Sequence, residues 1–103
     1  MSDKIKTLIL DEVATTRDSL KKLIEYQAEL EAVGLAGTGE EAIVQAKKLG
    51  PDIILMDANV RGGNGVEVIE RLSVEAPEAA IIIMSPQGKQ EYLQRALLAG
   101  AKN

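Results

Sequence analysis

Three carboxylates in this chain stand at points where apolar segments end. Asp11 and Glu12 directly follow the apolar residues 5–10. Asp57 directly follows the apolar residues 53–56. If both segments are neighbouring parallel strands, the carboxylates converge at the sheet edge where open α/β proteins bind ligands. Because like charges repel strongly at such range, the site should either hold protons or bind a hard cation, and Mg²⁺ suits these oxygen ligands best.

Asp57 and Ser85 are the candidates for phosphoryl chemistry. Asp57 precedes a glycine-rich loop, and a carboxylate can accept a phosphoryl group as a covalent aspartyl phosphate while a metal ion neutralises the transferring oxygens. Ser85 stands in the equivalent place after residues 80–84, where its hydroxyl could bond a phosphoryl oxygen. Acidic residues and serines after strands are also common turn formers and helix caps, and that reading stays open for each residue taken alone.

The elements that would position these side chains alternate regularly along the chain. Apolar runs rich in β-branched residues alternate with segments of helical period, a pattern typical of a parallel sheet wrapped by helices. The expected strands cover residues 5–10, 31–36, 53–56 and 80–84. The second run contains Gly34 and is flanked by glutamates, which suits an edge strand, whereas the uniformly apolar third run suits a strand buried on both faces.

A helix is expected after each of these strands. The first has Thr15 or Thr16 as its N-cap and an apolar stripe of Leu20, Leu23 and Ile24. The second carries Ala42, Ile43, Ala46 and Leu49 and ends at Gly50-Pro51, and the third places Val66, Ile69 and Leu72 inward. The last covers residues 90–99, with Gly100 as its stop.

The handedness of the connections constrains how these elements pack. Parallel crossovers are right-handed in about 98% of cases. In a doubly wound α/β sheet of strand order 2-1-3-4, this rule leaves the first helix alone on its face, while the second and third cover the other. One helix cannot cover four strands, and the apolar fourth strand lacks a neighbour. We therefore expect a fifth strand and a fifth helix to be missing, so that residues 1–103 form one domain that is incomplete at its C-terminus.

Composition excludes several classes of function. A chain of 103 residues holds one core, and its net charge of −4 with mixed signs argues against a nucleic-acid surface. The absence of cysteine and histidine excludes thiolate metal sites and most hydrolytic triads. With only Tyr26 and Tyr92 as aromatic residues, platforms for stacking bases are absent. No apolar run is long enough to span a membrane, and a cytoplasmic protein is expected.

Five motifs together resemble the response-regulator receiver family over essentially the whole chain. They are Leu-Ile-Leu-Asp-Glu (8–12), Pro-Asp-Ile-Ile-Leu-Met-Asp (51–57), Gly-Gly-Asn-Gly (62–65), Ile-Ile-Met-Ser (82–85) and Ala-Gly-Ala (99–101). The resemblance implies a CheY-like, flavodoxin-like receiver fold in which Asp57 is phosphorylated and Ser85 is the switch hydroxyl. It also implies a Mg²⁺ site formed by Asp11, Glu12, Asp57 and the backbone carbonyl of Asn59.

The resemblance also implies how such a domain works. Phosphoryl would come from the phosphohistidine of a sensor histidine kinase or phosphotransfer protein, by an autocatalytic transfer rather than by turnover of a separate substrate. An output domain or partner would then read the repositioned loop after the fourth strand. Residues 85–101 are similar, more narrowly, to receivers joined to MinD-like ATPases in Flp-pilus localisation proteins.

Several departures from the family pattern keep other functions open. Arg61 replaces the proline expected four residues after the acceptor, and Pro86 replaces the small residue expected after the switch hydroxyl. The family's lysine and aromatic switch residue on a fifth strand have no counterpart in the 103 residues. The alternative is a pseudo-receiver that serves as an interaction and targeting module without phosphorylation. A flavodoxin-like cofactor binder is disfavoured, because a phosphate loop and aromatic residues to stack on a flavin are lacking.

The edge of the fourth strand gives a further expectation. An apolar strand with an unpaired edge, beside a thinly covered sheet face, favours association with another chain. We therefore expect self-association through residues 80–84.

Overall fold

The four apolar runs form one parallel sheet of strand order β2-β1-β3-β4. The computed structural model describes residues 4–57, 65–84 and 100. The strands are β1 (Ile5–Leu10), β2 (Leu30–Ala36), β3 (Ile53–Asp57) and β4 (Ala80–Met84), and the helices are α1 (Ala14–Tyr26), α2 (Gly39–Leu49) and α3 (Gly65–Glu75). The predicted doubly wound order is confirmed. The helix predicted over residues 90–99 lies outside the described residues.

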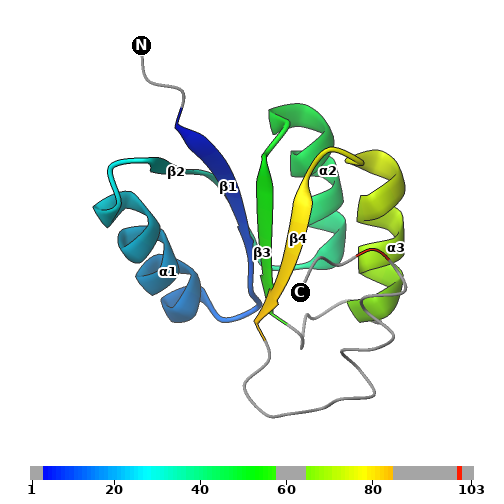
Figure 1. The fold of residues 1–103 in the computed structure, drawn as a ribbon. Helices are drawn as coiled ribbons and strands as arrows, with labels where there is room; N and C mark the ends of the chain where they lie inside the picture. Colours follow the sequence, from blue (N-terminus) through cyan, green and yellow to red (C-terminus); the bar gives the residue numbers. More distant parts are fainter. Residues whose placement is uncertain (1–3, 58–64, 85–99, 101–103) are drawn as a thin grey trace.

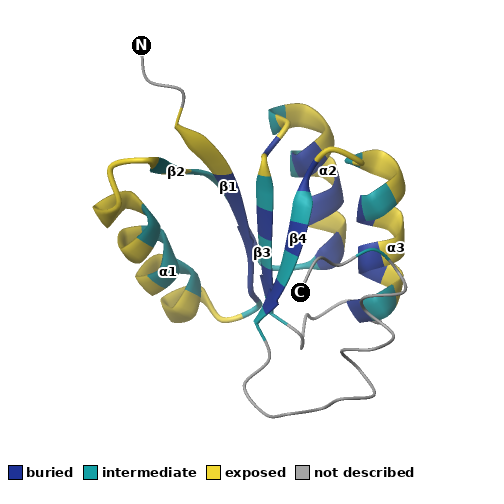
Figure 2. Cartoon of the chain, in the orientation of Figure 1, coloured by how far each residue is buried: buried dark blue, intermediate teal, exposed yellow. Residues whose placement is uncertain are grey.

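The helices lie on the two faces that the handedness rule predicts. Figure 1 shows α1 on one side of the sheet and the pair α2 and α3 on the other. The main core fills the space between the sheet and this pair, and its residues are dark blue in Figure 2. Strand residues that alternate toward this face are buried, as are one stripe of α2 and one of α3: Leu8, Leu10, Ile54, Met56, Ile81, Ile83, Ala42, Ile43, Ala46, Val68, Ile69 and Leu72.

The α1 face of the sheet is covered far less well. No residue of α1 is buried, and Leu23 is 64% exposed, so its predicted place in the buried stripe is wrong. Leu20 and Ile24 are half-buried. The reason is that, among the described strands, α1 packs mainly over β1 and β2. In β3, buried and half-buried residues alternate, which corrects the prediction of a strand buried on both faces.

The start of α1 also differs from the prediction. The helix begins at Ala14 with Val13 in the N-cap position, so the prediction of Thr15 or Thr16 as N-cap is wrong. No side chain caps it at Val13. Instead, the carboxylate of Asp11 accepts a hydrogen bond from the Val13 N–H at 2.9 Å, which anchors the chain just before the helix. This bond orders the turn before α1, but it does not replace a side-chain cap, because it involves the N–H of Val13 and not an N–H of the first helical turn.

The later elements agree more closely with their sequence signals. Thr38 caps α2 by accepting the Glu41 N–H at 3.2 Å, and Gly50 ends it in the left-handed conformation at φ 59°. In α3, Val68 is buried and Val66 is half-buried, so the inward stripe includes Val68 where Val66 was predicted.

The edge strand β2 carries one irregularity. Thr7 of β1 pairs with Ala32 of β2, but the next residue, Leu8, pairs with Gly34, so β2 contains one extra residue at Val33. Such a bulge shifts the register of everything that follows it by one position. After the bulge the pairing is regular, and Leu10 pairs with Ala36.

Candidate functional site

Asp11 and Asp57 lie at the ends of two adjacent strands. Leu10 of β1 pairs with Met56 of β3, so the residues that follow them, Asp11 and Asp57, come side by side at the carboxyl edge of the sheet. Both belong to the set of alternate residues that faces the α1 side, because Leu10 and Met56 are in the core on the opposite side. Asp57 pairs in turn with Met84 of β4. The predicted meeting of these strand ends is therefore confirmed.

The position of this edge within the sheet suits ligand binding. From β1 the sheet continues to β2 on one side and to β3 on the other. The helices that follow β1 and β3 consequently leave toward opposite faces, which opens a crevice between the strand ends in doubly wound proteins. Asp11 and Asp57 end the two strands that flank this switch point.

Asp11 is firmly held in place. It is only 4% exposed. Its backbone N–H donates to the Ala36 carbonyl at 3.0 Å, and its own carbonyl accepts a hydrogen bond from Arg17 Nη1 at 2.7 Å. Together with the bond from Val13 to its carboxylate, these contacts make Asp11 a turn former, one of the two readings left open by the sequence. The same contacts fix a buried carboxylate at the edge of the sheet, so the structural role and a ligand role are compatible.

The remaining predicted site residues are placed less completely. Glu12 lies in the turn between β1 and α1 and is half-buried, as is Asp57. Asn59 and Ser85 lie outside the described residues. Within residues 4–57, 65–84 and 100, no three acidic side chains approach one another closely enough to form a metal-binding group by themselves. The two neighbouring carboxylates nevertheless have the oxygen donors and the negative charge that suit a hard cation such as Mg²⁺.

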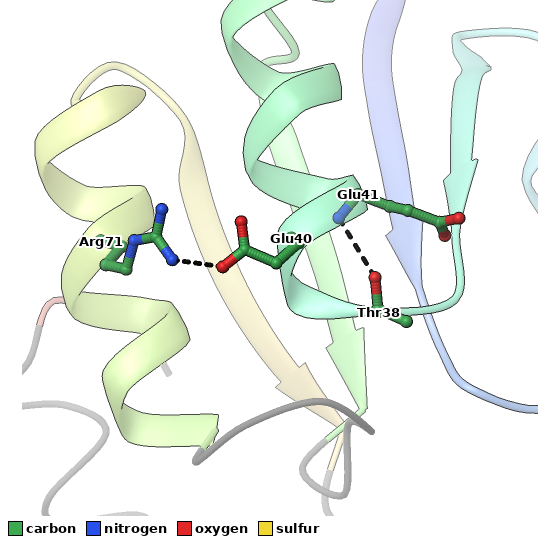
Figure 3. Close-up of polar contacts among 4 residues, drawn as sticks. All are labelled: Thr38, Glu40, Glu41 and Arg71. Atoms are coloured by element: carbon green, nitrogen blue, oxygen red, sulfur yellow. Dashed lines mark hydrogen bonds and ion pairs between the residues drawn. The ribbon is translucent and has the colours of Figure 1, made fainter.

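The turn between β2 and α2 lies at the same carboxyl edge of the sheet, next to Asp11. Glu41 Oε1 accepts the Gly37 N–H at 2.6 Å, while the Glu41 N–H donates to Thr38, so one residue at the start of α2 ties down the turn twice. Figure 3 shows the Thr38 contact and the Glu41 carboxylate directed away from it. Arg17 and Glu41 were not singled out from the sequence. The sequence offered two signals for these contacts. One is a cation in the first helix after the acidic pair, and the other is the glycine before the Thr38 cap.

Helix α3, which follows the segment after Asp57, is tied to α2 near this edge. Arg71 Nη1 lies 2.6 Å from Glu40 Oε2, as Figure 3 shows. Both side chains are largely exposed, so the pair contributes little to stability. The buried contacts of Val68, Ile69 and Leu72 hold α3 in place more strongly.

A hollow of about 280 Å³ lies at the opposite edge of the sheet, where α2 and α3 end. Its lining includes Pro51, Asp52, Glu75 and Pro77 and none of the predicted site residues. Because ligand chemistry in doubly wound sheets belongs to the carboxyl ends of the strands, we assign the candidate site to Asp11 and Asp57 and not to this hollow.

The chain matches a known family over nearly all of its length. Residues 7–103 match the model of the response regulator receiver domain. The chemotaxis protein CheY of Thermotoga maritima is 38% identical over 98 residues, which are 95% of this chain and 81% of that protein. The crystal structure of the CheX-CheY-BeF3-Mg complex from Borrelia burgdorferi contains a chain with a TM-score of 0.84 and 25% identity, covering 96% of this chain and 75% of that one.

These matches show that the chain belongs to the response regulator receiver domain family. It is a receiver domain of two-component signalling, the class of protein whose members serve as phospho-acceptors. The nitrate/nitrite response regulator protein homolog of Haemophilus influenzae is 31% identical over 101 residues, which are 98% of this chain and 49% of that protein. The chain thus spans about half of that relative.

One expectation from the sequence is narrower than the family itself. The relatives named above are not described as pilus proteins, so the similarity to receivers of Flp-pilus localisation proteins stays a prediction. Within the described residues, no helix combines the length and apolar character needed to cross a membrane.

Proposed function

We propose that Asp57 is the phospho-acceptor of this receiver domain and that Asp11, Glu12, Asp57 and the backbone carbonyl of Asn59 hold Mg²⁺. The observation that supports it best is the pairing of β1 with β3, which sets Asp11 beside Asp57 at the switch point of the sheet. At the general spacing of neighbouring strands, about 5 Å, two unit charges repel by roughly 3 kcal/mol at an effective dielectric of about 20. This repulsion favours the uptake of a divalent cation.

In the proposed reaction, a carboxylate oxygen of Asp57 attacks the phosphorus of a phosphohistidine on a sensor histidine kinase or phosphotransfer protein. The new O–P bond forms as the P–N bond breaks, and the released imidazole keeps the bonding electron pair. The Ser85 hydroxyl then donates a hydrogen bond to a phosphoryl oxygen. When bound, the metal ion neutralises charge on the transferring oxygens. We expect this transfer to occur in the cytoplasm, with the domain as acceptor and not as an enzyme that turns over a separate substrate.

An amide NMR titration tests this proposal. Mg²⁺ and then beryllofluoride, a phosphoryl mimic, are added to the chain and to its Asp57→Asn variant. We expect shifts at Asp11, Glu12, Asp57 and Ser85 that disappear in Asp57→Asn. The matched control is Asp52→Asn at the other end of β3, which removes the same charge while an amide oxygen can still accept the Lys6 N–H. A Mg²⁺ response that survives unchanged in Asp57→Asn would contradict the assignment of the acceptor.

The alternative function is a pseudo-receiver that binds partners without being phosphorylated. Pro86, which replaces the small residue that the family pattern has after the switch hydroxyl, favours it. The same titration separates the two functions. A folded chain whose amide spectrum responds to neither Mg²⁺ nor beryllofluoride would favour the interaction module.

We also propose that the chain associates with itself through β4, in addition to acting on an output domain or partner. Within the described residues β4 pairs only with β3, and Ile82 and Met84 on its α1 side are half-buried. Sedimentation at several concentrations tests this. Ile82→Glu is expected to weaken the association, whereas Val74→Glu, at a position of α3 that is 76% exposed, is expected to leave it unchanged. A monomer at all concentrations would rule out the association.

A further inference from the structure

Arg17 closes a ring of hydrogen bonds around the loop that carries the acidic residues. The Asp11 carboxylate accepts the Val13 N–H at 2.9 Å. The Val13 carbonyl accepts the Arg17 N–H at 3.0 Å, which is the first backbone bond of α1. Arg17 Nη1 then donates back to the Asp11 carbonyl at 2.7 Å. The three hydrogen bonds thus connect Asp11 to Val13, Val13 to Arg17 and Arg17 back to Asp11. Glu12 lies between Asp11 and Val13 in the sequence and so belongs to the segment that these bonds hold.

The neighbouring turn leaves room for the Arg17 side chain. A Cβ atom placed on Gly37 would lie 2.8 Å from Arg17 Nη1 and 3.5 Å from Arg17 Cζ. Gly37 is not among the described glycines with positive φ, which are Gly50 and Gly100, so its backbone does not require glycine. A Cβ atom at this position would instead displace the guanidinium, which is the far end of a flexible side chain, from the place where it meets the turn. Arg17 therefore contacts both loops that flank the end of β1.

The choice of atom on Asp11 matters for the chemistry of the site. Arg17 donates to the main-chain carbonyl, so it fixes the backbone of Asp11 through an atom that is separate from the carboxylate. Mg²⁺ demands nearly ideal octahedral geometry, and groups that orient its ligands commonly change metal affinity by about tenfold or more when they are removed. Arg17 itself is half-buried.

We propose that Arg17 is a positioning residue that holds the loop of Asp11 and Glu12 in its metal-binding conformation and so sets the affinity of the site for Mg²⁺. This inference rests on the proposed function. It makes a prediction whose sign is opposite to that of simple electrostatics. Removal of a cation beside an acidic site should strengthen binding of Mg²⁺ by Coulomb's law, whereas loss of a positioning residue should weaken it.

The test uses two variants that disturb the same contact from opposite sides. Arg17→Met removes the guanidinium, and Gly37→Ala leaves Arg17 in the chain but occupies its space. Each is expected to weaken Mg²⁺ binding by about tenfold in an amide NMR titration. The double variant should be no weaker than Arg17→Met alone, because both changes remove one shared contact. Arg17→Lys, which keeps a donor for the Asp11 carbonyl, should recover part of the affinity.

Lys21→Met is the matched control, since it removes the same charge one turn later in α1. It should leave Mg²⁺ affinity unchanged or slightly raised. Hydrogen exchange at the Val13 amide, measured without metal, reports the ring directly and should accelerate in Arg17→Met and Gly37→Ala. Equal Mg²⁺ affinity in the unchanged chain and in both variants would overturn this inference alone. Failure of the unchanged chain to bind Mg²⁺ would instead overturn the proposed function, and the inference with it.

Discussion

Gln45 of α2 donates its side-chain amide to the main-chain carbonyl of Leu35 in β2, at 2.8 Å. The contact is possible because Gly34 has no side chain, since a Cβ there would lie 2.4 Å from Gln45 Oε1. A helix on one face of the sheet thus satisfies a polar group of the edge strand. We infer that this bond helps to hold β2 against the rest of the sheet.

Gln45→Leu is expected to lower the free energy of unfolding by about 1 kcal/mol, because it leaves the half-buried Leu35 carbonyl without this donor. Urea denaturation measures the change. Val44→Ala is the control, since Val44 is 61% exposed and its truncation should shift stability by less than about 0.5 kcal/mol. Equal stability of Gln45→Leu and the unchanged chain would show that the hydrogen bond does not contribute to the free energy of unfolding.

Thr7→Val is expected to stabilise the chain by about 1 kcal/mol. Thr7 is 1% exposed, and within the described part of the chain its Oγ1 has no hydrogen-bond partner. Valine has nearly the same shape and removes a buried hydroxyl whose desolvation is not compensated. Thr16→Val, at an exposed position of α1, provides the comparison. A loss of stability in Thr7→Val would mean that the hydroxyl has a partner in solution.

Asp57→Asn is expected to raise the free energy of unfolding in the absence of Mg²⁺ by about 1 kcal/mol, because one of two neighbouring charges disappears. The gain should shrink as salt screens the repulsion. Saturating Mg²⁺ should reverse the order, since a cation at ten times its dissociation constant stabilises the unchanged chain by about 1.4 kcal/mol and the variant much less. Thermal melting with and without Mg²⁺ measures both effects, and Asp52→Asn should show neither.

Leu23 and Ile24 test the coverage of the α1 face. Leu23 is 64% exposed, whereas Ile24 is half-buried. Leu23→Ala should change stability by less than about 0.5 kcal/mol, while Ile24→Ala should cost about 1–2 kcal/mol. If Leu23→Ala proves the more costly change in urea denaturation, α1 packs on the sheet in a different rotation from the one described.

Much of the fold follows from local sequence signals. The ends of β1 and β4 agree with their apolar runs, and Gly50 ends α2 as its position before Pro51 indicates. The strand order 2-1-3-4 was taken from the usual doubly wound arrangement, and the handedness of crossovers then predicted the face on which each helix lies. With the order known, the adjacency of Asp11 and Asp57 required only that each follow its strand directly.

Other features depend on packing between distant segments and could not be read from the sequence. Leu23 has the spacing of a buried residue, but how many strands α1 covers decides its exposure. The N-cap of α1 was missed because it is Val13, an apolar residue whose side chain cannot cap a helix. The role of Arg17 depends on a turn twenty residues later, at Gly37, where the missing side chain has no local explanation.

The extra residue at Val33 determines which residue of the turn after β2 lies beside Asp11. Because Leu8 pairs with Gly34, Leu10 comes opposite Ala36, and the residue beyond each strand end brings Gly37 level with Asp11. Without the bulge, Gly37 would lie one position, roughly 3.3 Å, farther along the sheet. Arg17 would then meet the side of Ala36 in place of the open glycine. The one extra residue in β2, the strand farthest from β4, thereby aligns the loop that follows β1 with the loop that follows β2.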